Sequence, residues 1–128
     1  MDREIVDSLL TGMLQSAEGI SDLLFISGKP PFVEIHGRLN QFSIDGPGSV
    51  LTPLFIEQLA GHIMNGSEPL KMEFAATGSC DCSYAIENLA RFRVNIFKQN
   101  GRHAVVMRKL QSEVPTLEQL PRGSGRGK

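Results

Sequence analysis

Residues 90–110 read ARFRVNIFKQNGRHAVVMRKL, and this stretch decides the fold because it predicts a β-hairpin. Apolar and polar residues alternate on both sides of Asn100-Gly101. This pair favours a two-residue type I′ turn, because both central residues of such a turn need positive φ. With these residues as the turn, Gln99 faces Arg102, and the register of every other cross-strand pair follows.

The register places like charges opposite each other, because it sets Arg93 against Arg108. Such a pair destabilises a sheet unless an anion lies near the two guanidiniums. The anion is either a carboxylate, for which Asp81 and Glu73 are candidates within the chain, or a phosphate, since guanidinium binds both bidentately. The arginine face also carries Arg91 and Asn95, and the opposite face, expected to line the core, carries Phe92, Val94, Ile96, Val105 and Met107.

Outward from the hairpin, the chain alternates helical and strand patterns. Apolar residues at helical spacing and the helix start Thr52-Pro53 predict helices at 2–18, 53–64 and 67–75, with a short helical turn at 115–120. Strands are expected at 22–27, 32–36, 38–42, 79–86, 89–98 and 102–110, and residues 43–51 are expected to form a loop. The sequence therefore predicts an α+β fold, an antiparallel sheet meander with packed helices.

The size and composition are those of one globular domain. The chain has 128 residues, of which 41% are hydrophobic and 21% charged, and this is enough to bury a core. No apolar run approaches the roughly 18 to 20 residues of a membrane span, and the first residues are acidic rather than basic. A soluble, cytoplasmic protein is expected.

The cysteines and histidines predict no metal site. Cys80 and Cys82 would share one face of a strand, where adjacent side chains rarely reach disulfide geometry, so packed thiols are expected. His36, His62 and His103 form no ligand spacing. No nucleophile–base pair stands out either.

The end of the sequence, RGSGRGK at residues 122–128, superficially resembles a phosphate-binding loop. That motif requires Gly where Arg122 stands, and a Ser or Thr after Lys128 to bind magnesium. We therefore expect a domain over residues 1–120, followed by a flexible tail or truncated linker at 121–128.

Charge is divided unevenly along the chain. Residues 1–90 contain 12 acidic and 4 basic side chains, whereas residues 91–128 contain 2 acidic and 9 basic ones. The basic part indicates either an anionic partner or an ordinary solvated face.

Taken together, these segments resemble the amino-terminal domain of the PilT-like ATPases of the type II and type IV secretion superfamily. Besides the hairpin, residues 20–31, ISDLLFISGKPP, resemble the family's ASDLHLSAGLPP, and residues 33–37 resemble its IRVDG. Residues 116–120, TLEQL, resemble the segment that leads towards the family's nucleotide-binding core. The resemblance covers about residues 1–120.

The resemblance implies a PAS-like domain beside a RecA-like core in a homo-hexameric motor for type IV pilus retraction (twitching motility) or type II secretion. ATP and Mg would bind in the core, and the P-loop and Walker B acid are absent from this chain, so no catalytic residue and no ATPase activity are expected of it alone. The implied partners are the core of the same and the neighbouring subunit and an inner-membrane platform protein, without nucleic acid. The arginines implied to contact ATP are Arg91, Arg93, Arg102 and Arg108.

Three positions depart from the family pattern. Leu24 replaces the His of SDLHL, Cys82 replaces an aromatic residue, and Arg38 alone remains of a basic cluster. These departures leave open whether the motor retracts, assembles or secretes. Two other functions are compatible with the sequence: a free-standing PAS-like sensor or interaction module, and a nucleic-acid binder. The second needs aromatic residues beside the arginines, and Phe97 is the only one that the hairpin places on the arginine face.

Overall fold

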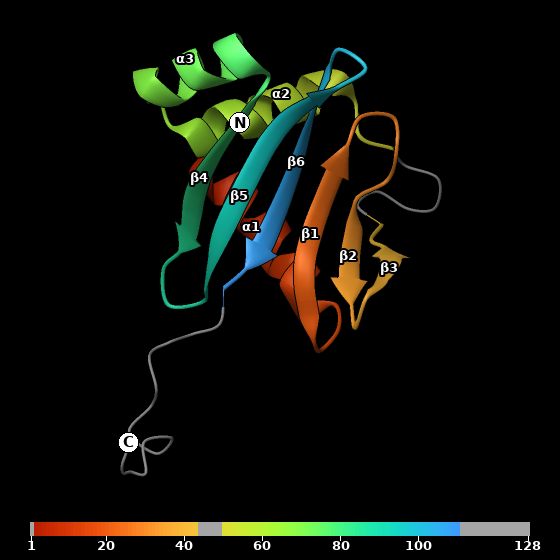
Figure 1. Ribbon diagram of the computed structural model, residues 1–128. Coiled ribbons are helices and arrows are strands. Elements are labelled where there is room, and N and C mark those ends of the chain that lie inside the picture. The colour runs from red at the N-terminus through yellow and green to blue at the C-terminus, as the bar shows by residue number, and fades with distance from the viewer. Residues whose placement is uncertain (1, 44–49, 111–128) are drawn as a thin grey trace, which may run out of the picture.

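The computed structural model describes residues 2–43 and 50–110 (Figure 1). They form three helices and one antiparallel six-stranded sheet, which confirms the predicted α+β fold. The helical turn expected at 115–120, the tail expected at 121–128 and most of the loop expected at 43–51 lie outside the described residues. Within the described residues, no helix is both long and apolar enough to cross a membrane.

The three helices are α1 (Arg3–Gln15), α2 (Pro53–Met64) and α3 (Glu68–Thr77). Side chains cap all three, since Asp2, Thr52 and Ser67 each accept a hydrogen bond from a backbone N–H of the first turn. The helix predicted over 2–18 ends earlier than expected. The chain leaves α1 at Ser16, and Gly19 takes a φ of +81° to turn into the first strand.

The strands are β1 (Ile20–Ile26), β2 (Phe32–Ile35), β3 (Arg38–Gln41), β4 (Ser79–Ile86), β5 (Ala90–Gln99) and β6 (Arg102–Lys109). Their order across the sheet is β3-β2-β1-β6-β5-β4. The sheet thus consists of two meanders that meet where β1 pairs with β6. Each predicted strand is present, with ends that differ by no more than two residues.

The hairpin register is as predicted. Gln99 pairs with Arg102 and Arg93 pairs with Arg108. Asn100 and Gly101 have φ values of 53° and 78°, the positive angles that a type I′ turn needs.

The core lies between one face of the sheet and the helices. Figure 1 shows α1 and α2 behind the sheet, whereas no helix covers the face towards the viewer. The apolar side of the hairpin is buried as predicted, and α1 contributes Val6, Leu10 and Met13. The sheet therefore has one buried face and one open face.

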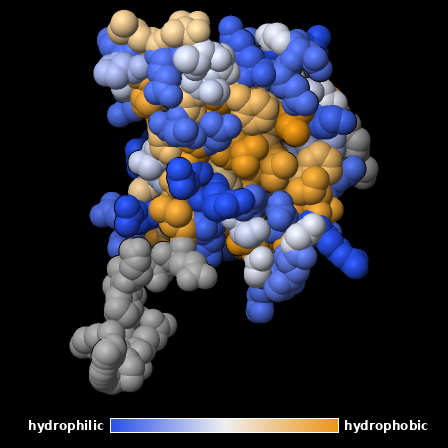
Figure 2. Space-filling view, viewed as in Figure 1, coloured by the Kyte–Doolittle hydropathy of each residue, from blue (hydrophilic) through white to orange (hydrophobic). Residues whose placement is uncertain are grey.

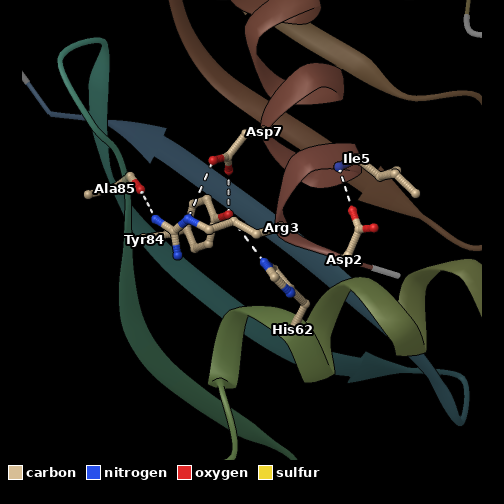
Figure 3. Close-up of polar contacts among 7 residues, drawn as sticks. All are labelled: Asp2, Arg3, Ile5, Asp7, His62, Tyr84 and Ala85. Carbon is tan, nitrogen blue, oxygen red and sulfur yellow. Dashed lines mark hydrogen bonds and ion pairs between the residues drawn. The ribbon is translucent and has the colours of Figure 1, made fainter.

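A polar cluster ties both long helices to β4 (Figure 3). The Tyr84 hydroxyl donates to the Asp7 carboxylate of α1 and lies 3.3 Å from His62 Nε2 of α2. Arg3 lies over the Tyr84 ring and donates to the Ala85 carbonyl at 2.9 Å. Burial, followed by the hydrogen bond to Asp7, raises the pKa of Tyr84, so the phenol keeps its proton.

Candidate functional site

A row of charged residues crosses the open face of the sheet. The strand registers place Glu34 beside Asp22, Asp22 beside Arg108, Arg108 beside Arg93 and Arg93 beside Ser83. The row therefore changes sign at the contact between β1 and β6. Its positive half belongs to the hairpin that the sequence singled out.

Asp22 supplies the carboxylate that the arginine pair was expected to need. Its Oδ1 lies 3.4 Å from Arg108 Nε, and Asp22 is only 7% exposed. The sequence suggested Asp81 or Glu73 for this role, and that choice was wrong. Asp81 instead accepts a hydrogen bond from Asn95 Nδ2 at 2.9 Å.

Arg93 and Arg91 have no such partner. Both are exposed, and the two ion pairs among residues 2–43 and 50–110 involve only Arg3 and Arg108 as cations. Arg93 has Arg108 on one side and the uncharged Ser83 on the other. Of the cross-strand pair Arg93 and Arg108, both exposed, only Arg108 is therefore balanced by a carboxylate among the described residues.

Arg102 does not join this group. It lies at the turn end of β6, six residues from Arg108. At a rise of roughly 3.3 Å per residue, about 20 Å separates the two positions. The four arginines of the predicted site thus divide into a group of three (Arg91, Arg93 and Arg108) and a separate Arg102.

An apolar patch lies between these two positions. Figure 2 shows hydrophobic atoms gathered on the open face over the central strands. Leu24 pairs with Phe32 on one side and with Val106 on the other, and Phe97 follows Asn95 on the same face. Phe97 is therefore not the only aromatic residue of the arginine face, since Phe32 shares it. Sequence reasoning missed this because the pairing of β1 with β6 joins segments about 80 residues apart in the chain.

The two cysteines lie on the core side of β4. Both are free, with Cys80 buried and Cys82 half-buried. Burial is the main cause that raises the pKa of the Cys82 thiol to about 11, and it raises the pKa of Cys80 as well. They pack as protonated thiols, as the sequence predicted.

Two proteins of Pseudomonas aeruginosa are similar to the chain in sequence. The type IV pilus ATPase PilU is 30% identical over 108 residues, which cover 84% of this chain and 26% of PilU. The type IV pilus retraction ATPase PilT is 33% identical over 109 residues, which cover 83% of this chain and 29% of PilT. The chain thus spans between a quarter and a third of the length of these relatives. No family model matches it.

Solved structures share the fold. A crystal structure of the pilus retraction motor PilT with bound ADP has a TM-score of 0.67 at 29% identity, covering 94% of this chain and 32% of that one. The ATPase DotB of Legionella pneumophila has a TM-score of 0.64 at 24% identity, covering 89% and 32%. DotB of Yersinia pseudotuberculosis has a TM-score of 0.63 at 19% identity, covering 96% and 34%. The two DotB likenesses concern the fold alone.

Proposed function

We propose that this chain, which belongs among the amino-terminal domains of PilT-like type IV pilus and secretion ATPases, docks onto an ATPase core and donates arginines to the ATP bound there. The similarity to both PilT and PilU favours a pilus motor over a secretion motor. ATP and Mg²⁺ would be held by the core, because the sequence contains no complete phosphate-binding loop.

The observation that carries this proposal is the imbalance of charge at Arg93 and Arg108. Asp22 balances Arg108, while Arg93 has no carboxylate partner among the described residues. A γ-phosphoryl group would complete the row, since guanidinium groups stabilise the charge that develops on phosphoryl oxygens during transfer. Arg91, which lies two residues before Arg93 on the same strand face, adds to the positive field.

The apolar patch supports a docking role for the same face. Leu24, Phe32 and Val106 form it and are each half-buried, and apolar surface rimmed by charge is typical of protein interfaces. The partner would be the core of the same subunit or of the next one in a homo-hexameric ring. The ring would act on the cytoplasmic side of the inner membrane, through a platform protein.

The test is single-residue replacement in the chain joined to its ATPase core. Arg93→Ala should lower kcat by about 10³-fold, the lower end of what arginines of this kind contribute. Arg38→Ala, on the exposed edge strand β3, is the matched control and should leave kcat unchanged. Equal turnover by the Arg93→Ala and Arg38→Ala proteins would contradict the proposed role. The isolated chain should show no ATP hydrolysis.

A further inference from the structure

A second basic site lies at the other end of the sheet. A cleft of about 360 Å³ opens between the turn that follows β1 and the tip of the β5–β6 hairpin. Its lining includes Ile26, Ser27, Lys29, Gln99, Asn100 and Arg102. Because Arg102 is six residues from Arg108 along β6, this cleft is separate from the arginine row.

The topology of the sheet brings the two turns together. β1 and β6 are antiparallel, and Ile26 at the end of β1 pairs with Ala104 near the start of β6. The chain therefore leaves β1 beside the hairpin tip. No local sequence pattern predicts that these two turns lie side by side, because the two segments are far apart in the chain.

Hydrogen bonds hold the wall of the cleft in place. Ser27 Oγ donates to the carbonyl of His103 at 3.3 Å, which links the turn after β1 to β6. The Lys29 carbonyl accepts from Leu51 N at 2.9 Å, and Lys29 N donates to the Ile26 carbonyl at 3.1 Å. The backbone that carries Lys29 is thus fixed on both sides, which limits the ordering cost of binding.

The charge of the cleft is positive and unbalanced. Lys29 and Arg102 both line it, and none of the acidic side chains that the structure describes does. Within the part of the chain that the structure describes, neither residue takes part in an ion pair. Two cations that line one cleft repel each other, and an anion bound between them would remove this repulsion.

We propose that this cleft binds a small phosphate ester of about mononucleotide size. Lys29 would contribute a point charge and Arg102 a planar fork, a combination suited to a phosphoryl dianion. The side-chain amides of Gln99 and Asn100 offer donors and acceptors to a sugar or base, and Ile26 offers an apolar surface. The volume lies at the lower end of the roughly 300 to 1,000 Å³ typical of small-ligand sites.

The experiment is a titration of the 128-residue chain followed by amide NMR, with AMP and inorganic phosphate as separate probes. AMP should shift the amides of residues 26–29 and 99–103 and bind more tightly than phosphate. Lys29→Gln and Arg102→Gln should each weaken AMP binding about tenfold, as expected for the loss of one charge-assisted contact. Arg38→Gln, on the exposed edge strand β3, is the matched control and should keep the affinity within twofold.

Three outcomes would overturn the inference. They are the absence of any shift at the two turns, an equal loss of affinity in the Arg38→Gln control, and tighter binding of an acidic peptide than of AMP. Equal affinity for AMP and inorganic phosphate would reject an ester and leave a plain anion site, which also contradicts the proposal. None of these outcomes bears on the role of Arg93 with an ATPase core, which is measured separately by turnover.

Discussion

Replacing Arg93 and replacing Arg108 should have unequal effects on stability, although the hairpin register places both on the same face as cross-strand partners. Arg93 is exposed and has no carboxylate partner among the described residues, so Arg93→Ala removes a repulsion and little else. The free energy of unfolding should change by less than about 0.5 kcal/mol, or rise slightly. Arg108→Ala leaves the buried carboxylate of Asp22 without its ion-pair partner and beside Glu34.

The size of the second effect follows from exposure. Removing one partner of a fully buried pair costs roughly 3 to 5 kcal/mol, but the Arg108 side chain is 70% exposed, so water already screens the pair. We therefore expect a loss of about 1 to 2 kcal/mol, close to that of one unsatisfied buried polar group. For a domain of about 120 residues, this corresponds to a fall in Tm of roughly 4 to 8 °C.

Thermal melts of the isolated chain test this difference. The double replacement Asp22→Asn with Arg108→Ala should recover most of the lost stability, because it removes the stranded charge together with its partner. If Arg93→Ala and Arg108→Ala reduce Tm equally, the argument from Asp22 fails. It fails equally if the double variant is no more stable than Arg108→Ala.

Three further predictions concern the rest of the molecule. Tyr84→Phe removes the hydroxyl that joins Asp7 to His62 and should lower the free energy of unfolding in urea by about 1 to 2 kcal/mol. Amide hydrogen exchange in α1 should become faster, and unchanged exchange would contradict this role of the hydroxyl. The raised pKa of Cys82 means that the folded chain holds the thiol proton more tightly than the unfolded chain does. The stability that this proton contributes is therefore complete below about pH 9 and is lost as the pH rises through about 11. Cys82→Ala should flatten that fall in stability, which urea unfolding at several pH values measures. Light scattering should find the isolated chain as a monomer or weak dimer, and a tight hexamer would show that assembly does not need the core.

The local features of the fold could be predicted because single short segments determine them. Asn100-Gly101 sets the hairpin register by its positive φ angles, and Thr52-Pro53 starts α2 where the capping rules place it. The pairing of β1 with β6 has no comparable local signal, since it depends on which strand edges meet after collapse. The partner of Arg108 was missed for this reason, although a charged Asp22 beside the apolar run 23–26 was a visible anomaly.

The predicted arginine site was likewise correct where a local pattern determined it and incorrect where long-range position mattered. Alternation placed Arg91, Arg93 and Arg108 on one face, and the structure agrees. Resemblance to a family added Arg102, but the length of β6 separates that residue from the others. To decide which residues form one site, the position of a residue along its strand is therefore as informative as the face it lies on, because one face extends over the whole length of the sheet.

The open face contains three zones along its strands: the charged row, the apolar patch and the basic cleft. β5 and β6 run through all three and pair along the hairpin from Phe92 to Arg102, so we expect the hairpin to move as one body. Arg108 is further tied to β1 by Asp22, so a shift of this domain over a docked partner would carry Arg93 and Arg108 together. A core seated on Leu24 and Val106 in the middle of the face would therefore translate a small rotation into a larger displacement at both ends. On the proposed function, such an arrangement would couple domain motion to the nucleotide, because the arginines lie at an end of the face rather than at its centre.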